Sequence, residues 1–361
     1  MNSTRQLHEL GQSLWLDNIT RDILDKGTLQ RYIAEYSVTG LTSNPTIFDE
    51  AIGKSGAYDA GIRAKARAGL AGEALFIELA LEDLRRAADL FLPTFRATGG
   101  GDGWVSMEVS PLLADDAPRT LSAAKAIYAQ AERANLFVKI PGTPAGIGAI
   151  EEAIFAGVPI NVTLLFSREQ YLAAAEAYLR GIERRRAAGL DLTVASVASL
   201  FVSRWDRAVS AAPLPEALRN RLGLAIGQRC YAAYRKLLNS KRWRDLAGAG
   251  ARPQRLLWAS TGTKDPKANP SLYVEGLAAP GTVNTMPEKT LLAFADQGRI
   301  GGAIPEDGGD CEAVLRAYAE ARIDIDALAL TLQKEGAESF VKSWKELMEL
   351  INVKSTALGR S

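Results

Sequence analysis

Histidine is almost missing from this chain, since His8 is the only one among 361 residues. A Ser-His-Asp triad, a metal centre with several histidine ligands and a pair of acid/base histidines would each need more than His8 can supply. The scarcity argues against all three. Proton transfer, if the protein is an enzyme, must then fall to carboxylates, lysine, tyrosine or bound water.

Cysteine is equally scarce, because Cys230 and Cys311 are the only two. They lie far apart in helix-like stretches, and we expect two buried thiols. No apolar run approaches the length of a membrane span, and the first residues lack the apolar core of a signal peptide. The sequence therefore predicts a cytoplasmic protein that does not engage a membrane.

Excess charge is missing as well. The 43 basic and 42 acidic residues leave a formal charge of +1, which gives no indication of nucleic-acid binding. An even balance still allows a small basic pocket, which a phosphorylated metabolite would need.

Short apolar or β-branched runs alternate with longer segments of helical periodicity. The eight predicted strands are residues 14–17, 39–43, 104–109, 137–140, 160–165, 193–199, 255–260 and 281–285. The clearest helical segments between them are residues 71–91, 117–134, 167–188 and 215–238. No Gly-x-Gly-x-x-Gly follows the first strand, so this α/β pattern favours a (β/α)8 TIM barrel over a doubly wound open sheet.

The barrel is expected to form one domain over residues 1–361. Its C-terminal helical extension covers about 308–361, with helices predicted at 311–321 and 324–351. The glycine run 99–103 precedes a strand, and we interpret it as a flexible turn. Residues 51–72 could form a mobile cover, although a plain surface connection is the preferred interpretation.

Polar side chains recur at the C-terminal ends of these strands, where barrel enzymes build their sites. They are Asp17, Thr42, Asn44, Ser106, Glu108, Lys139, Asn161, Thr163, Ser199 and Ser260. A single serine or threonine at such a place is more often a helix cap or a hydrogen-bonded core hydroxyl. The whole set predicts a pocket.

Lys139 is the most informative member of the set, because it interrupts the apolar run Phe137 to Pro141. An ammonium group is costly to bury, so a lysine inside a packed strand tends to become a nucleophilic amine that can attack a carbonyl. A lysine that reaches from an edge strand to solvent is the alternative that this segment alone leaves open.

Five ordered segments resemble the transaldolase family, and the long C-terminal extension resembles its larger bacterial branch. The segments are Leu41-Thr42-Ser43-Asn44-Pro45-Thr46, Val105-Ser106-Met107-Glu108-Val109, Val138-Lys139-Ile140-Pro141-Gly142-Thr143, Ile160-Asn161-Val162-Thr163-Leu164-Leu165-Phe166-Ser167 and Ser199-Leu200-Phe201-Val202-Ser203-Arg204. They spread over most of the barrel.

The resemblance implies a role for each matched residue. Lys139 corresponds to the lysine that forms a Schiff base. Asp17 corresponds to the carboxylate that moves protons during carbon–carbon cleavage, and Glu108 to the acid/base group that acts through a water. The expected substrate-binding residues are Thr42, Asn44, Ser106, Asn161, Thr163, Ser199, Phe201, Arg204, Ser260 and Lys264.

The implied activity is transfer of a dihydroxyacetone unit from sedoheptulose 7-phosphate to glyceraldehyde 3-phosphate, giving erythrose 4-phosphate and fructose 6-phosphate in the pentose phosphate pathway. The partners would be small sugar phosphates, and neither metal nor organic cofactor is implied, because the protonated imine acts as the electron sink. The sequence does not decide between a monomer and a homodimer.

Three alternatives stay open. A fructose 6-phosphate aldolase would share the fold and the lysine, although that group has glutamine and tyrosine where Glu108 and Phe201 stand here. A glycosidase could use Asp17 and Glu108 as its carboxylate pair but would leave Lys139 without a role. A catalytically silent sugar-phosphate binding protein would not need a buried amine.

The chain departs from the family pattern after the seventh strand. Shorter transaldolases have an arginine there, whereas this chain has Lys264, which could contact phosphate as a point charge without the bidentate fork. Leu200 replaces a proline found in many members, a difference that does not affect the chemistry.

Overall fold

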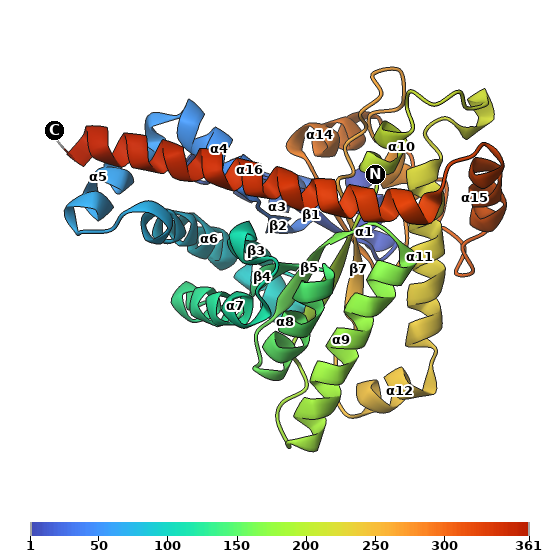
Figure 1. Ribbon diagram of the computed structural model, residues 1–361, viewed down its shortest axis with the longest axis horizontal. Coiled ribbons are helices and arrows are strands. Elements are labelled where there is room, and N and C mark those ends of the chain that lie inside the picture. Colours follow the sequence, from blue (N-terminus) through green and yellow to red (C-terminus); the bar gives the residue numbers. More distant parts are fainter. Residues whose placement is uncertain (1, 360–361) are drawn as a thin grey trace.

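The computed structural model describes residues 2–359 and shows a barrel of eight parallel strands surrounded by helices (Figure 1). The strands are β1 Ser13–Asp17, β2 Val38–Thr42, β3 Val105–Glu108, β4 Leu136–Pro141, β5 Ile160–Leu165, β6 Ser196–Phe201, β7 Gln254–Ala259 and β8 Val283–Met286. Consecutive strands from β3 to β8 are paired, and β8 pairs with β1, which pairs with β2. The predicted (β/α)8 fold and all eight strands are confirmed.

Two backbone hydrogen bonds close the barrel between β2 and β3. Leu41 N donates to Trp104 O over 2.9 Å, and Gly103 N donates to Thr39 O over 3.0 Å. Gly40 makes this close approach possible, because a Cβ at that position would lie 2.7 Å from both Trp104 O and Trp15 Nε1. A larger residue there would force β2 away from β3.

Helices follow the strands around the outside of the barrel. The structure contains α1 Ser3–Glu9, α2 Arg21–Asp25, α3 Thr28–Tyr36, α4 Pro45–Lys54, α5 Asp59–Arg67, α6 Gly72–Ala97, α7 Ala117–Ala131, α8 Pro144–Phe155, α9 Arg168–Ala187, α10 Ser203–Ala208, α11 Leu222–Leu238, α12 Lys241–Gly248, α13 Leu272–Gly276, α14 Glu288–Gln297, α15 Cys311–Glu320 and α16 Ile325–Gly359, with 3-10 turns η1 Gly56–Tyr58, η2 Pro111–Leu113 and η3 Glu216–Leu218. Ser167 and Gln170 form a capping box that starts α9, as expected for a helix directly after a strand.

Several predicted boundaries were wrong. Helices α6 and α16 end at Ala97 and Gly359, later than the predicted residues 91 and 351. Strand β6 begins at Ser196 and not at residue 193, because its partner β5 begins at Ile160, which lies opposite Ser196. The helix predicted from residue 215 begins at Leu222. Asn220 has φ 57°, and this left-handed conformation separates η3 from α11.

Two predicted loops are held more firmly than the sequence indicates. Residues 51–72 contain the end of α4, η1 and α5, and Lys354 of α16 contacts Asp59 across 2.9 Å, so this segment is not a plain connection. The glycine turn at 99–103 is fixed by arginines. Arg252 Nη1 donates to Gly100 O over 3.1 Å and Arg255 Nη1 donates to Gly101 O over 3.0 Å.

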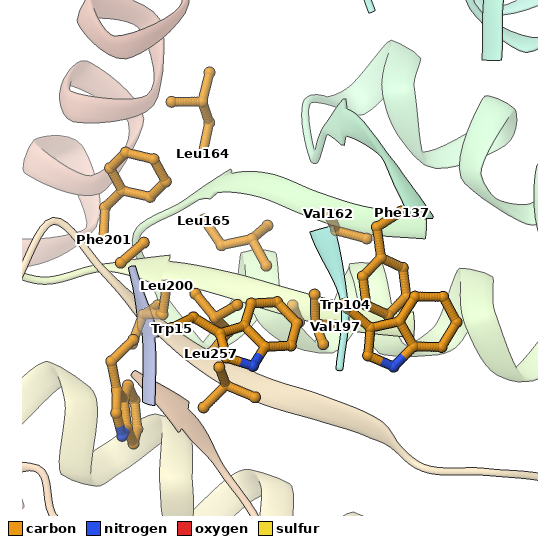
Figure 2. Packing of buried hydrophobic residues seen from close by; sticks show 14 of the residues in the cluster. Trp15, Trp104, Phe137, Val162, Leu164, Leu165, Val197, Leu200, Phe201 and Leu257 are labelled. Atoms are coloured by element: carbon orange, nitrogen blue, oxygen red, sulfur yellow. The ribbon is translucent and has the colours of Figure 1, made fainter. Parts of the chain in front are cut away.

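The inward positions near the N-terminal ends of the strands are aromatic. Trp104 and Phe137 stack with ring centroids 4.0 Å apart, and Trp15 lies beside Phe137 at 6.1 Å (Figure 2). All three side chains are buried. Aromatic packing therefore fills one end of the barrel, and the polar inward residues gather at the other.

Helix α16 runs across the molecule from the end of α15 to α5 (Figure 1). Gln333 of α16 donates to Gly142 O and Leu164 O, at the C-terminal ends of β4 and β5. The helix consequently lies over the strand ends that carry the polar residues. Within residues 2–359, no helix combines the length and the apolar character needed to cross a membrane. Cys230 and Cys311 are buried free thiols, as predicted.

Candidate active site at the carboxyl ends of the strands

Lys139 points into the barrel and is buried, with 6% of its surface exposed. Its Nζ donates a hydrogen bond of 2.7 Å to Ser43 O and lies 3.4 Å from Glu108 Oε2. The alternative of a lysine that reaches from an edge strand into solvent is therefore wrong. The parallel register explains the pairing, because Lys139 on β4 lies opposite Glu108 on β3.

Glu108 is as deeply buried as the lysine. Burial raises the pKa of its carboxyl group above the ordinary value, against the opposing effects of Lys139 and of the Thr163 hydroxyl. Thr163 Oγ1 donates to Glu108 Oε1 over 3.4 Å. Oε2 faces Lys139 Nζ and, within residues 2–359, is buried without a hydrogen-bond partner. A carboxylate with a raised pKa and one oxygen facing the amine can accept a proton from the lysine or from a water.

Asp17 ends β1 and accepts a hydrogen bond of 2.7 Å from Thr42 Oγ1. Thr42 Oγ1 also lies 2.6 Å from Thr285 Oγ1. Burial raises the pKa of Asp17, while Lys139, the Thr42 hydrogen bond and Lys264 act to lower it. The second predicted carboxylate therefore shares the electrostatic environment of the amine.

The neutral polar residues form a hydrogen-bonded chain along the inner wall. Ser199 Oγ donates to Asn161 Oδ1 over 2.6 Å, and Asn161 Nδ2 donates to Ser106 Oγ over 3.3 Å. Ser43 Oγ donates to Ser106 O over 2.8 Å. Strands β3, β5 and β6 thus bring together three of the predicted substrate-binding side chains and fix their rotamers.

A cavity of about 710 Å³ reaches the candidate site at Asp17 and Asn44. Its lining includes Asp17, Asn44, Arg204, Lys264 and Phe340. Asn44 directly follows Ser43, which accepts the Lys139 hydrogen bond, so the cavity and the amine adjoin at that peptide. Asn44 Oδ1 also accepts from Ile47 N and caps α4, which fixes the side chain and leaves its amide Nδ2 to donate to a ligand.

The two predicted phosphate contacts lie on this cavity wall. Arg204 is half-buried over the Phe201 ring, with Cζ 5.0 Å from the ring centroid, and Lys264 is exposed. Desolvation by the surrounding protein atoms, which is partial for the exposed Lys264, lowers the pKa of both cations, and the charge of Arg207 lowers it further in each. Two cations beside an open cavity are chemically suited to bind a dianion.

Ser260 is placed differently from the other predicted residues. It follows β7 with φ 55°, and its Oγ lies 2.9 Å from Ser203 Oγ. Its backbone carbonyl accepts from Ser203 N over 3.1 Å. These contacts give Ser260 a role in holding the start of α10, and therefore Arg204, in place.

Sequence reasoning missed several residues of this region. Thr285 has the same signal as its neighbours, a hydroxyl at the C-terminal end of a strand. No sequence signal marks the residues of α16 that reach this region, because only the packing of the helix brings them to the barrel mouth. They are Gln333, Gly336 and Phe340. A Cβ on Gly336 would lie 2.9 Å from Leu164 Cδ2 and 3.1 Å from Arg204 Nη1.

Comparison with known proteins agrees with this geometry. The family model described as "Transaldolase/Fructose-6-phosphate aldolase" matches residues 14–351. The chain is 45% identical to a protein named "Transaldolase" from Thermobifida fusca (strain YX), over 96% of each chain. It is 43% identical to "Transaldolase" from Frankia alni, covering 100% of this chain and 98% of the relative. It is 42% identical to "Transaldolase" from Thiobacillus denitrificans, covering 97% and 100%.

Proposed function

The chain belongs to the transaldolase/fructose-6-phosphate aldolase family, and we propose that it is a transaldolase that transfers a dihydroxyacetone unit between sugar phosphates through a Schiff base on Lys139. The observation that carries the proposal is the buried Lys139 Nζ 3.4 Å from Glu108 Oε2. A glycosidase or a passive binding protein has no use for this amine.

The first half of the reaction joins the ketose to the enzyme. Lys139 Nζ attacks the keto carbon of the donor, and the resulting carbinolamine loses water to form the imine. Glu108 carries the protons for both steps through a water, which suits its raised pKa. Asn161, Ser106 and Ser199 are suited to hold the donor hydroxyls and that water, because they are short and uncharged.

The second half breaks and remakes a carbon–carbon bond. Asp17 accepts the proton of the donor's C4 hydroxyl as the bond between C3 and C4 breaks, and the electron pair moves into the protonated imine to give an enamine. The aldose phosphate leaves, and an acceptor aldose phosphate takes its place. The enamine attacks the new aldehyde, Asp17 returns the proton to its oxygen, and water releases the product.

The proposed substrates follow from the cavity. Arg204 and Lys264 would hold the phosphate at its rim, and a volume of about 710 Å³ is within the range of small-ligand sites. Sedoheptulose 7-phosphate with glyceraldehyde 3-phosphate is the proposed pair, in the pentose phosphate pathway. We place the enzyme in the cytoplasm, in keeping with such substrates.

Transfer has to be separated experimentally from simple cleavage, because the family description names both enzymes. Purified protein is incubated with fructose 6-phosphate, with and without erythrose 4-phosphate, and free dihydroxyacetone and sedoheptulose 7-phosphate are measured. A transaldolase forms sedoheptulose 7-phosphate and little free dihydroxyacetone. Steady release of dihydroxyacetone without an acceptor would identify an aldolase instead. Glu108→Gln is the informative variant, because the aldolases have glutamine at the matching place.

A further inference from the structure

Lys264 lines two cavities. One is the candidate active site, and the other has a volume of about 390 Å³. Arg207, Arg219 and Lys267 line the second cavity together with Lys264. The sequence does not single out Arg207, Arg219 or Lys267, and the proposed reaction does not use them.

The carboxylates of the second cavity are occupied by neutral donors. Asp206 accepts from Leu222 N over 2.9 Å, from Gly223 N over 3.0 Å and from the Tyr273 hydroxyl over 2.8 Å. Asp265 accepts from Asn220 Nδ2 and from Lys267 N, each over 2.9 Å. Within residues 2–359 neither carboxylate forms an ion pair, although the charges of Lys267 and Arg219 add to the effect of these hydrogen bonds in lowering the pKa of Asp265.

Three of the four cations that line this cavity have no ion-pair partner among the described residues. Within residues 2–359, Arg207, Lys264 and Lys267 form no ion pair, and Arg219 alone has a partner, Glu216, at 2.7 Å. Arginines elsewhere on the protein form ion pairs with nearby carboxylates. Arg242, for example, contacts Glu176 and Glu183, each over 2.6 Å.

Grouping like charges without counter-charges costs free energy unless an anion occupies the space between them. Arg207 and Arg204 each act to lower the pKa of Lys264, after the larger effect of burial. A substrate phosphate accounts for Arg204 and Lys264, but it leaves Arg207 and Lys267 unexplained.

We propose that the second cavity binds a phosphate-bearing anion between Arg207, Lys267 and Lys264, separately from the substrate. Val209, Leu214 and Pro266 give the cavity an apolar wall, which suits a phosphate ester with a compact apolar group better than free phosphate. Because Lys264 is shared, the bound anion draws this cation away from the substrate phosphate and raises KM. This effect on KM rests on the proposed function, whereas the binding does not.

Calorimetric titration with phenyl phosphate and with orthophosphate, at constant ionic strength, tests the binding. Arg207→Ala and Lys267→Ala should each weaken phenyl phosphate binding about tenfold, as expected for a lost charge-assisted hydrogen bond. Lys125→Ala is the matched control, because exposed Lys125 on α7 lines neither cavity. Phenyl phosphate should bind more tightly than orthophosphate, and equal affinities would overturn the assigned ligand class.

Two further results would overturn the site itself. If Arg204→Ala abolishes the binding and Arg207→Ala leaves it intact, the anion occupies only the substrate's phosphate position. If Lys125→Ala weakens binding as much as Arg207→Ala, the attraction is unspecific.

Kinetics then tests the coupling. Phenyl phosphate should raise KM for fructose 6-phosphate in the wild-type protein without changing kcat, and Arg207→Ala should remove this effect while keeping the basal activity. An equal rise of KM in Arg207→Ala would contradict the coupling. If phenyl phosphate binds in the calorimeter but the protein does not catalyse transfer, the proposed function alone is contradicted. If the protein catalyses transfer but Arg207 does not contribute to phenyl phosphate binding, the second site alone is contradicted.

Discussion

Gln333 of α16 donates a hydrogen bond of 2.9 Å to the carbonyl oxygen of Leu164, and one of 3.1 Å to that of Gly142. Leu164 has φ 56°, a left-handed conformation that a leucine rarely adopts. It directly follows Thr163, whose hydroxyl donates to Glu108. The C-terminal helix thereby holds the strand ends that carry the candidate catalytic residues.

Gln333→Met should reduce kcat/KM by about tenfold and lower the free energy of unfolding by about 1–3 kcal/mol, because two carbonyl groups lose their donor. Methionine has a similar length but cannot donate. Chemical denaturation and steady-state kinetics measure the two effects. Lys334→Met, at the exposed neighbouring position, is the control and should change neither. Wild-type kinetics in Gln333→Met would show that α16 does not position the site.

Gly336→Ala should raise KM for phosphorylated substrates several-fold and leave kcat nearly unchanged. The new Cβ would lie 3.1 Å from Arg204 Nη1 and 2.9 Å from Leu164 Cδ2, so the arginine has to move from its place beside the cavity. Gly148→Ala in α8 is the matched control, because no atom lies within 4 Å of a Cβ there. That change should preserve KM and stabilise the helix by up to about 1 kcal/mol. Equal effects of the two substitutions would contradict the proposed contact with Arg204.

Thr42→Val should move the acid limb of the kcat/KM profile to higher pH. In the proposed mechanism Asp17 acts as a carboxylate, so activity should fall as the pH falls through its pKa, which burial has already raised. The Thr42 hydrogen bond acts to lower that pKa, and removing it raises the pKa further. Thr42→Ser keeps the hydroxyl and should keep the limb in place. A limb that stays put in Thr42→Val, or moves to lower pH, would show that Asp17 does not control it.

Lys264→Ala should mainly raise KM for phosphorylated substrates, by about tenfold if one charge-assisted hydrogen bond is lost. Lys264→Arg should restore most of the affinity, since a guanidinium also binds phosphate. Initial-rate kinetics with fructose 6-phosphate checks both variants. An unchanged KM in Lys264→Ala would place this lysine outside the phosphate site.

The sequence predicts the barrel well because its strands are short apolar runs with a polar residue near the C-terminal end. In β4, five apolar residues surround Lys139. Glu108 ends the neighbouring strand β3 at the position opposite Lys139, so both side chains belong to the inner face. The boundaries that failed depend on other parts of the chain. The start of β6 is set by the neighbouring strand, and the start of α11 by the backbone conformation of Asn220.

The contribution of α16 could not be predicted, because its periodicity shows which face is apolar but not which surface it covers. The sequence gives no functional signal at Gln333 or Gly336. Their importance follows from their contacts with Leu164 and Arg204 in the folded protein. The second cavity could not be predicted for the same reason. Arg207 lies far in the sequence from Lys264 and Lys267, and only the fold brings the three residues to one cavity.

The central claim is that Lys139 forms a covalent imine with the donor ketose. The direct measurement is incubation with fructose 6-phosphate, reduction with borohydride and peptide mass spectrometry, with Lys139→Ala as the control. A Schiff base on Lys139 predicts a mass increase of one reduced dihydroxyacetone unit or one reduced ketose phosphate, located on Lys139 and missing from the variant. A wild-type protein that turns over substrate without this label, or that carries it on another lysine, would contradict the account.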